Sequence, residues 1–514
     1  MVKGRCDVNL AASIYRAVRQ FPDRIAAIQG DVQWTYQELH DRAMALAEYF
    51  LQEGMKPGDR IAAWLPNSLH EIALAYATWW AGGVFVPINT RLSSEEILVL
   101  LSDAQPRWIA ITPSQLSVFE GTSWPLLVAG RDPVGPGVAM DSLYQFTGFP
   151  KSPAAARHDG DLALLMYTSG TTGRPKGVRQ THRNNTASAE MVIEAWDVTS
   201  ADRFLLTVPL FHVGGMQCAM LPALIAGASV ILLPKWSAPE WVHLAHAHRA
   251  TIAALVTTML IDVARWSASH PDQVPRLSHM RIVVTGGSAT PAAVCGEFEK
   301  VTGLPLIELY GQTELTGLAV TYRAGEKRVP NSMGHVQGQT VEAKILDAGG
   351  HMVPPGSPEA GELVFRGDTV SPGYWHNDAK TAERLVGGWL HTGDIVRWDA
   401  EEFLYYIDRA DDMIVTGGEN VYPAEIEAIL ARHPGVVQAA IVGLPHERWG
   451  QQVTAFVVCR DDTVTEGELL RFLKEDSGLA DYKRPGRIVL VQNLPTTGSG
   501  KVNKAHLKQY GSPA

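Results

Sequence analysis

Two apolar stretches built in the same order constrain the fold of this chain more than any other feature. In IALAYATWWAGGVFVPI (72–88), an alanine-rich run meets Gly82 and Gly83 and continues into a strand-like segment. In AMLPALIAGASVILLP (219–234), an apolar run ends at Ala226 and Gly227 before SVILLP. Each stretch predicts a helix that ends at glycine and is followed by a fully buried strand, as in a parallel α/β layer. Both are too short and too interrupted to span a membrane comfortably, so we expect no transmembrane segment.

Further strand-like runs extend this pattern along the chain. They include RIAAWL, WIAIT, RIVVTGG and PLIELYG, and amphipathic helical stretches separate most of them. Such alternation favours doubly wound sheets, and the likeness of the two apolar stretches suggests two α/β subdomains of similar design. From about residue 341 to 407, short runs alternate with Gly, Pro and Asp turns, which predicts a small antiparallel β region.

The C-terminal part of the chain predicts a separate small domain. A helix at 423–432, the strands VVQAAIVGL and QVTAFVVCR, and a helix at 466–476 indicate a compact α+β unit. The 514 residues are too many for one ordinary core. We therefore expect a large N-terminal α/β domain over residues 1–408 and a small, mobile C-terminal domain over 412–514, with a hinge near 409–411.

The composition narrows the classes of partner. The formal net charge of −10 argues against nucleic acid as the main partner, because phosphate binding normally requires a basic surface. The four cysteines (6, 218, 295 and 459) are scattered, which suits a reducing cytosol and gives no support for a zinc site. The N-terminus has no apolar segment typical of a secretory signal. We expect a cytoplasmic protein, and the sequence is compatible with a homodimer.

The stretch LLMYTSGTTGRPKGV (164–178) carries the strongest chemical signal. A buried strand runs into a loop rich in glycine and in hydroxyl side chains, which are those of Thr168, Ser169, Thr171 and Thr172. Glycine allows the backbone to wrap around an anion, and successive N–H groups can then point at phosphate oxygens. Lys176 adds positive charge nearby. A flexible surface turn is the alternative interpretation of such a loop.

The segment TSGTTGRPKG resembles the phosphate loop of the adenylate-forming superfamily, which includes acyl- and aryl-CoA synthetases, peptide-synthetase adenylation domains and firefly luciferase. The resemblance continues in order over nearly the whole chain. It extends through PLFHVGG (209–215), VTGGSATP (284–291), LYGQTE (309–314), WLHTGD (389–394), DRADDMIVTGGENVYPAEIE (408–427) and PTTGSGKVNK (495–504). The chain looks most similar to aryl- or medium-chain acyl-CoA ligases.

The resemblance implies an ATP site with Mg2+. It implies that Thr168 and Glu314 coordinate the metal, that Tyr310 lies against adenine, and that Asp394 and Arg409 bind the ribose; a carboxylate and a cation suit these tasks. Taken alone, Glu314 and Asp394 could be capping residues. The other residues implied in ATP or AMP binding are Ser169, Gly170, Thr171, Thr172, Gly173, Lys176, Gly287, Ser288, Gly311, Gln312 and Thr313.

The resemblance also implies two half-reactions. A carboxylate attacks the α-phosphorus of ATP, and a thiol then attacks the resulting acyl-adenylate. No Ser-His-Asp or Cys-His constellation is detectable, which fits a reaction without a covalent enzyme nucleophile. Lys501 matches the C-terminal lysine that reaches the carboxylate and α-phosphate during adenylation. Asp411 matches the hinge about which the small domain rotates, and Gly418 belongs to the face brought in for the second step.

Three features favour free coenzyme A as the thiol. Trp449 matches an aromatic residue of CoA ligases, and Arg91 matches a phosphate-contacting arginine of aryl-CoA ligases. Tyr482 stands beside Lys483 and Arg484, and such an aromatic with two cations suits an adenine and a 3′-phosphate. Each has a plain alternative, since a Lys-Arg pair is usually a solvated surface.

The acid is expected to be a hydrophobic monocarboxylate. The residues assigned to the acyl pocket form a mainly apolar wall, which suits such a ligand; they are Phe211, His212, Thr258, Gly286 and Leu309. We assign His212 to carboxylate orientation or pocket gating, although a lone histidine is more often a core residue. Malonyl-CoA synthetases carry an arginine at the position of Leu309. The choice between benzoate-type and medium-chain acids stays open.

Two other functions are consistent with parts of the sequence. An adenylating enzyme that loads a phosphopantetheinyl carrier protein would share the first half-reaction. A non-catalytic nucleotide-binding protein is disfavoured, because a degenerate member would be expected to lose some of five key residues that are all present: Thr168, Glu314, Asp394, Arg409 and Lys501.

Overall fold

The computed structural model describes residues 9–130, 137–145, 158–168, 175–273, 276–287, 290–416, 419–461, 463–475, 479–496 and 502–510. These residues divide into two compact units. The first takes the described residues within 1–168, 175–343 and 365–390, and the second takes those within 344–364 and 391–514. Each unit is described by its own contacts below.

A seven-stranded sheet forms one layer of the first unit, with the strand order β7-β6-β5-β3-β4-β8-β9. Every pairing in it is parallel except β8–β9, which is antiparallel. The strands are β3 (Arg60–Trp64), β4 (Val84–Pro87), β5 (Trp108–Ile111), β6 (Leu126–Val128), β7 (Val138–Ala139), β8 (Leu162–Thr168) and β9 (Lys176–Thr181).

A nine-stranded sheet forms the second layer, in the order β16-β15-β14-β13-β12-β10-β11-β1-β2. The strands from β14 to β1 are parallel, β15 and β16 add two antiparallel pairings at one end, and β2 adds one at the other. The strands are β1 (Ile25–Gln29), β2 (Val32–Thr35), β10 (Arg203–Leu206), β11 (Ser229–Leu232), β12 (Ile252–Leu255), β13 (Ile282–Thr285), β14 (Leu306–Gln312), β15 (Gly317–Thr321) and β16 (His335–Val336). The two predicted α/β subdomains are thus confirmed, and the N-terminal hairpin β1–β2 belongs to the second of them.

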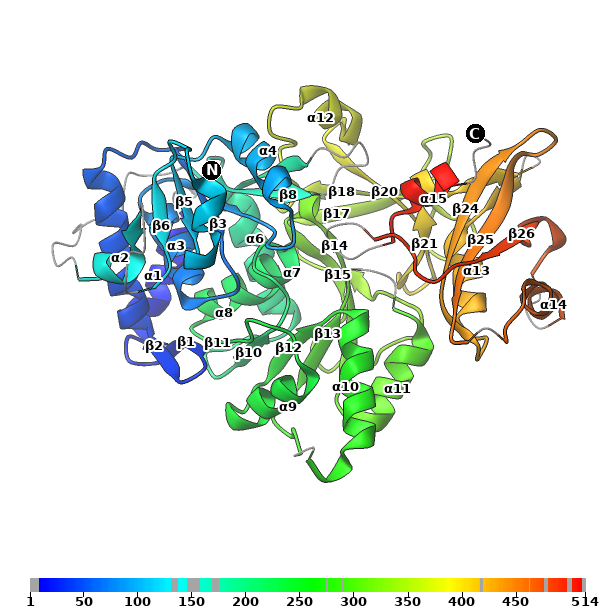
Figure 1. Ribbon diagram of the computed structural model, residues 1–514, viewed down its shortest axis with the longest axis horizontal. Helices are drawn as coiled ribbons and strands as arrows, with labels where there is room; N and C mark the ends of the chain where they lie inside the picture. Colours follow the sequence, from blue (N-terminus) through cyan, green and yellow to red (C-terminus); the bar gives the residue numbers. More distant parts are fainter. Residues whose placement is uncertain are drawn as a thin grey trace. The chain divides into compact units, whose positions relative to one another are not determined.

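The first unit also contains helices, most of which connect and cover these two sheets (Figure 1). They are α1 (Leu10–Gln20), α2 (Tyr36–Gln52), α3 (Leu69–Trp80), α4 (Ser94–Ala104), α5 (Met140–Leu143), α6 (His182–Ala195), α7 (Val213–Gly215), a π-helix (Met216–Met220), α8 (Leu221–Ala226), α9 (Ala238–Ala247), α10 (Thr257–Ser269), α11 (Ala292–Thr302) and α12 (Asp378–Arg384). Short 3-10 turns lie at Pro113–Phe119, Pro271–Gln273 and Thr313–Leu315.

The two apolar stretches fold as the sequence predicted. Helix α3 ends at Trp80, Gly82 follows with φ of +81°, and β4 begins at Val84. Helix α8 ends at Ala226, and Gly227 caps it with a φ of +78°, which lies in the left-handed region that glycine tolerates. A Cβ at Gly227 would lie 2.4 Å from the ring of Phe21, so this position also needs glycine for close packing.

The predicted antiparallel region is a five-stranded sheet with the order β17-β18-β20-β19, and β21 also pairs with β20. The pairings β19–β20 and β20–β21 are antiparallel. The strands are β17 (Val341–Leu346), β18 (Gly361–Gly367), β19 (Leu385–Val386), β20 (Trp389–Trp398) and β21 (Leu404–Arg409).

The C-terminal region has the α+β character that the sequence predicted. Its sheet runs β23-β22-β25-β24, with β26 parallel to β25, and packs an apolar core that includes Ile426, Ile441 and Leu469. Strand β26 and the pair β22–β23 were not predicted. The elements are β22 (Ile414–Thr416), β23 (Glu419–Val421), α13 (Pro423–Leu430), β24 (Val436–His446), β25 (Gly450–Cys459), α14 (Glu466–Glu475), β26 (Arg487–Leu490), α15 (Lys504–Tyr510) and 3-10 turns at Ala410–Asp412 and Asp481–Lys483.

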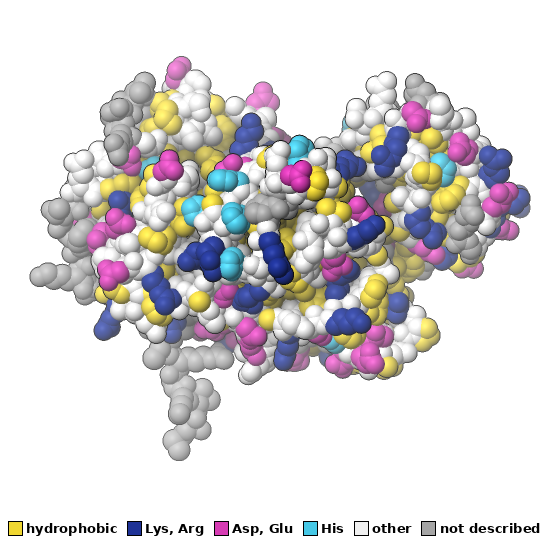
Figure 2. Space-filling model, turned by 90° about the horizontal axis from the view of Figure 1, so that it is seen from below, with side chains coloured by type: hydrophobic (Ala, Val, Ile, Leu, Met, Phe, Trp, Pro, Cys, Tyr) yellow, Lys and Arg dark blue, Asp and Glu magenta, His cyan; other side chains and the backbone are white. Residues whose placement is uncertain are grey.

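Acidic and basic side chains are interspersed over the face of the molecule shown in Figure 2. Within the described part of the chain, every helix is too short or too polar to cross a membrane.

Candidate functional site

The hairpin β8–β9 supplies the base of the predicted phosphate loop, the hydroxyl loop TSGTTGRP (168–175). Thr168, the last residue of β8, pairs with Lys176, the first residue of β9. Desolvation and the neighbouring cation of Lys380 lower the pKa of Lys176, while the Glu314 carboxylate acts in the opposite direction. A Cβ at Gly177 would lie 3.1 Å from the ring of Tyr167. Glycine therefore lets that ring lie against the hairpin beside Thr168.

Glu314 lies directly after β14, in the turn Thr313–Leu315. Its backbone oxygen accepts a hydrogen bond of 2.8 Å from the N–H of Ser371. Its Oε1 accepts one of 2.7 Å from the hydroxyl of Tyr374. Burial and this carboxylate raise the pKa of Tyr374, so the hydroxyl remains a donor. Among the described residues, Oε2 of Glu314 accepts no hydrogen bond, and it is therefore the oxygen available to a ligand.

The strand that leads to Glu314 approaches its neighbour unusually closely. Gly311 sits where the register of β14 and β15 shifts, and a Cβ there would lie 1.8 Å from the backbone oxygen of Gly317. Beside it, Tyr310 is buried and stacks on Phe365, with ring centroids 6.4 Å apart. Gln312 donates to the Tyr310 hydroxyl over 3.3 Å. The structure thus holds the predicted adenine-contacting residue firmly in place.

Two residues assigned to the acyl pocket are in contact. A Cβ at Gly286 would lie 2.6 Å from Cδ1 of Leu309, so only glycine leaves room for this leucine. Gly287 follows with φ of +85°, which glycine adopts readily. Thr258 is exposed near the start of α10. Phe211 and His212 lie next to each other in another segment of the first unit, with ring centroids 4.6 Å apart.

A buried amide cluster lies under this region and was not predicted. Gln217, in the π-helix that follows α7, donates to Oε1 of Gln180 over 2.7 Å and to Oδ1 of Asn185 over 2.9 Å. Gln180 in turn donates to the backbone oxygen of Thr313 over 3.0 Å. The cluster therefore connects β9 with the turn that holds Glu314. A π-helix is rare and often marks a functional site, but no sequence pattern announced it.

Glu308 in β14 makes the folded state sensitive to pH. Desolvation raises the pKa of this carboxyl to about 7, although Arg328 lies 3.4 Å away and opposes the shift. The folded protein therefore holds a proton that the unfolded chain releases near pH 4.5. The stabilisation is complete below pH 4.5 and is lost as pH rises through about 7.

We expect Glu308→Gln to remove much of that dependence. The wild-type protein should lose up to about 3 kcal/mol of unfolding free energy between pH 4.5 and pH 7 through this group, and the variant should not. Thermal unfolding midpoints measured over this range check the prediction. Parallel curves for the two proteins would contradict it.

The ribose-binding candidates belong to the second unit. Asp394 in β20 and Arg409 in β21 pair across the two strands, and Arg409 donates to Oδ1 of Asp394 over 2.9 Å. Asp394 is buried, whereas the Arg409 side chain is partly exposed. Asp408, next to Arg409 in the chain, accepts a hydrogen bond of 2.8 Å from Ala424 N at the start of α13. Its carboxylate thus anchors that helix.

The residues proposed for coenzyme A differ in their surroundings. Trp449 and Tyr482 are exposed. Lys483 pairs with Glu425 at 2.7 Å, and Arg484 pairs with Asp481, so both cations already have acidic partners. Arg91 is exposed in the first unit. Asp411, the predicted hinge residue, is exposed in the turn Ala410–Asp412.

Several predicted site residues lie outside the described part of the chain. They are Ser169, Gly170, Thr171, Thr172, Gly173, Ser288, Gly418 and Lys501. Their roles stay predictions.

Two family models match the chain. The model of the AMP-binding enzyme matches residues 14–375, and the model of the AMP-binding enzyme C-terminal domain matches residues 425–501. The chain belongs to the AMP-binding enzyme family. The predicted membership of the adenylate-forming superfamily is thereby confirmed.

Named relatives of this AMP-binding enzyme are CoA ligases. A feruloyl-CoA synthase of Amycolatopsis sp is 35% identical over 499 residues, which cover 96% of this chain and 97% of the relative. The o-succinylbenzoate CoA synthetase of Bacillus subtilis is 30% identical in two solved structures. The complex with the acyl-adenylate intermediate has a TM-score of 0.84 and covers 96% of this chain and 97% of that one. The complex with ATP and magnesium ion has a TM-score of 0.83, with coverages of 96% and 99%. The predicted enzyme class, an acid–thiol ligase, is confirmed.

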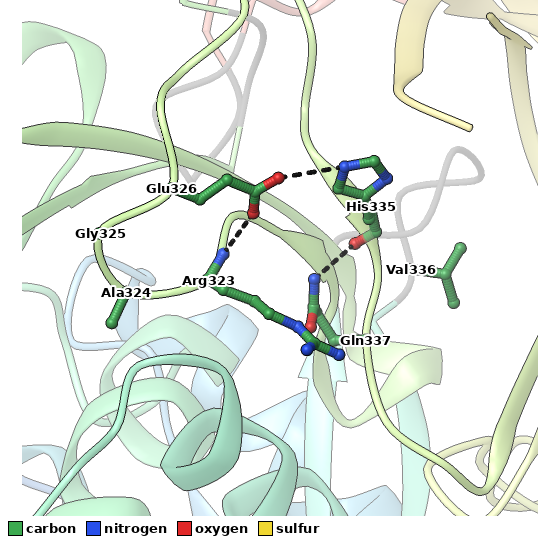
Figure 3. A pocket seen from close by; sticks show the side chains of 7 residues that line it. All are labelled: Arg323, Ala324, Gly325, Glu326, His335, Val336 and Gln337. Carbon is green, nitrogen blue, oxygen red and sulfur yellow. Dashed lines mark hydrogen bonds and ion pairs between the residues drawn. The ribbon is translucent and has the colours of Figure 1, made fainter. Parts of the chain in front are cut away.

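A cavity of this AMP-binding enzyme lies beside the edge strand β16 of the nine-stranded sheet. It has a volume of about 480 Å³ and lies along β16 and the segment after β15 (Figure 3). Glu326 connects the two segments that line the cavity. Its carboxylate accepts a hydrogen bond from Arg323 N over 2.8 Å and forms an ion pair with His335 at 3.1 Å. The predicted site residues do not line it, so we place no step of the reaction there.

Proposed function

We propose that this AMP-binding enzyme is an ATP-dependent aryl-CoA ligase. The carboxylate of a hydrophobic acid attacks the α-phosphorus of ATP and displaces pyrophosphate. The thiol of coenzyme A then attacks the acyl carbon of the adenylate, AMP leaves, and the thiol proton is released. The single observation that best supports adenylation is the placement of Thr168, Lys176 and Glu314, because strand β9 links the base of the hydroxyl loop to the segment that holds Glu314.

The oxygen donors of the first unit fit a magnesium site. Thr168 offers a hydroxyl, and Glu314 offers Oε2, while its Oε1 is already engaged by Tyr374. Mg2+ prefers few protein oxygens together with phosphates and water, and such a donor set meets that preference. When bound, the ion neutralises charge on the triphosphate. Lys176 and the hydroxyl loop orient the phosphates beside it.

The remaining ATP contacts follow the family resemblance. We assign the adenine to Tyr310, Gly287 and Ser288, and the ribose to Asp394 and Arg409. The contact between Asp394 and Arg409 supports this assignment, since the two side chains can bind neighbouring hydroxyls of one sugar only if they lie together. Lys501 is proposed to neutralise the carboxylate and the α-phosphate during adenylation.

The small domain is proposed to act as a mobile lid. We place it at residues 412–514, with the hinge at 409–411 and Asp411 as the residue that absorbs the rotation. Trp449, Tyr482, Lys483, Arg484 and Gly418 would bind coenzyme A from this domain, and Arg91 from the large one. To bind a phosphate of coenzyme A, Lys483 and Arg484 would have to exchange their ion pairs with Glu425 and Asp481 for contacts with that phosphate.

The acid pocket favours an aromatic or other apolar acid. Leu309 presents an apolar side chain against Gly286, and a second carboxylate would find no cation at this position. The named relatives, which act on feruloyl and o-succinylbenzoyl groups, favour an aryl acid over a medium-chain one.

Cytoplasmic location and a homodimer are further proposals, which fractionation and light scattering would test.

A panel of carboxylic acids tests the function. Each acid is incubated with ATP, Mg2+ and coenzyme A, and AMP, pyrophosphate and acyl-CoA are measured. The expected result is CoA-dependent AMP formation that is highest with benzoate- or cinnamate-type acids. A phosphopantetheinyl carrier protein in place of coenzyme A provides the comparison. Preferred transfer to the carrier would overturn the CoA-ligase proposal, and no turnover of any acid would overturn ligase activity altogether.

Leu309→Ala tests the acyl pocket. Truncation removes the side chain that packs against Gly286 and leaves space in the apolar wall. We expect kcat/KM for the best aryl acid to fall by about 10- to 100-fold, with the KM for ATP unchanged. Steady-state kinetics with acid and ATP varied in turn check this. Equal changes in both KM values would show that Leu309 supports the whole site and does not line the acid pocket.

A further inference from the structure

The segment SPGYW, residues 371–375, holds Glu314 at two points. The N–H of Ser371 donates to the backbone oxygen of Glu314 over 2.8 Å. The hydroxyl of Tyr374 donates to Oε1 of the same residue over 2.7 Å. One contact places the main chain and the other places the carboxylate. A side chain held at both ends has little freedom to leave its rotamer.

The same segment also pairs with β9, the strand that leaves the hydroxyl loop. Tyr374 and Val178 form an antiparallel bridge. On either side of it, Arg179 N donates to the backbone oxygen of Gly373 over 3.0 Å, and Trp375 N donates to that of Gly177 over 2.7 Å. Since β9 is the edge strand of its sheet, residues 373–375 extend that sheet by a short additional pairing.

The position of Tyr374 is fixed by helix α12 as well. Its backbone N–H donates to Oγ1 of Thr381 over 2.9 Å. The side chain of Tyr374 is 5% exposed, so its hydroxyl exchanges little with solvent. Gly373 allows this approach, because its φ is +118° and a Cβ there would lie 2.3 Å from Cγ2 of Thr381. The tyrosine is therefore held independently of the carboxylate that it contacts.

We propose that Tyr374 is a positioning residue for the metal-binding carboxylate and sets its distance from strand β9. Its hydroxyl donates a hydrogen bond to Oε1 of Glu314, which leaves Oε2 available to the Mg2+ of bound Mg2+-ATP. Its backbone, paired with β9, ties that carboxylate to the strand that starts at Lys176. This inference rests on the proposed function, because it needs a nucleotide with its metal in the site.

Tyr374→Phe tests the proposal, because it removes the hydroxyl and keeps both the ring and the backbone pairing. Calorimetric titration with ATP is carried out with Mg2+ and, separately, with EDTA, without any acid or coenzyme A. We expect the gain in ATP affinity that Mg2+ provides to fall by about 10-fold, with affinity in EDTA unchanged. The Mg2+ concentration for half-maximal AMP formation should rise in parallel.

Tyr36→Phe is the matched control. It also removes a buried tyrosine hydroxyl, which donates to the backbone oxygen of Ala228 over 2.6 Å, in a part of the first unit with no predicted role. This variant should resemble Tyr374→Phe in thermal stability and should bind Mg2+-ATP like the wild type. An equal loss of Mg2+ dependence in both variants would show a general effect of stability and overturn the proposal.

A double-mutant cycle separates positioning from simple packing. In a Glu314→Gln background, Tyr374→Phe should have no further effect on the Mg2+-dependent gain, because the tyrosine acts through that carboxylate. Additive losses would overturn the proposal. If the wild-type enzyme binds ATP equally with and without Mg2+, the magnesium part of the proposed function fails. If the wild type shows the gain and Tyr374→Phe retains it in full, only the present inference fails.

Discussion

Lys501→Ala should abolish acyl-adenylate formation and spare thioester formation from supplied acyl-AMP. In the first half-reaction two anions must meet, and a cation between the carboxylate and the α-phosphate lowers their repulsion most in the transition state. We expect the adenylation rate to fall by at least about 100-fold. In the second half-reaction the thiol attacks an uncharged acyl carbon and needs no such cation, so its rate should change by no more than about twofold.

Contacts among described residues of the C-terminal segment lead us to expect that this substitution will not unfold the domain. On either side of Lys501, Thr496 and Val502 form an antiparallel bridge. Lys504 pairs with Glu427 at 2.9 Å, and Leu507 is buried in a small apolar core. These contacts anchor the C-terminal segment without Lys501.

Pyrophosphate release and thioester formation from synthetic acyl-AMP are measured separately for the variant. Lys508→Ala is the matched control, because it removes another lysine of the C-terminal segment, whose ammonium lies 4.0 Å from Asp412, and it should retain both rates. Equal loss of the two half-reactions in Lys501→Ala would show a structural role and contradict the prediction.

The sequence was most informative where a local pattern determines the structure. Glycine at positions 82 and 227 ends a helix because of the backbone conformation it allows, and both helix–strand units form as predicted. Asp394 and Arg409 were expected on one sugar, and they lie 2.9 Å apart across two adjacent strands. Their binding of ribose stays a prediction. The relevant residues belong to one short segment in the first case and to two recognised motifs in the second.

The sequence was least informative where the partner lies far along the chain. Tyr374 contacts Glu314 across 60 positions, and a tyrosine in SPGYW has no local feature that reveals this bond. The pair Lys483–Arg484 was assigned to coenzyme A from its charge, but Glu425 and Asp481 already lie against these two cations. Charge and spacing show which groups are present, and only the tertiary fold shows which of them are already paired.

Gly311→Ala should damage the first unit most among single substitutions in β14. A Cβ at this position would lie 1.8 Å from the backbone oxygen of Gly317 and 3.0 Å from Cα of Leu318. Backbone atoms cannot move aside as a flexible side chain can, so β14 and β15 must separate. We expect a loss of roughly 3 kcal/mol in unfolding free energy. The KM for ATP should rise by at least about 10-fold, because the residue before Gly311 is Tyr310, to which we assign the adenine.

Gly296→Ala provides the matched control for that prediction. Gly296 lies within α11 (Ala292–Thr302), and a Cβ there meets nothing within 4 Å. Alanine favours a helix interior over glycine by about 1 kcal/mol, so this variant should be slightly more stable and kinetically unchanged. Thermal unfolding and ATP-dependent kinetics of both variants are compared with the wild type. A Gly311→Ala variant that matches the wild type in both measurements would contradict the close approach of β14 and β15. If it unfolds readily while Gly296→Ala does not, glycine in LYGQTE is required by the neighbouring strand, and the loop that holds Glu314 depends on that contact.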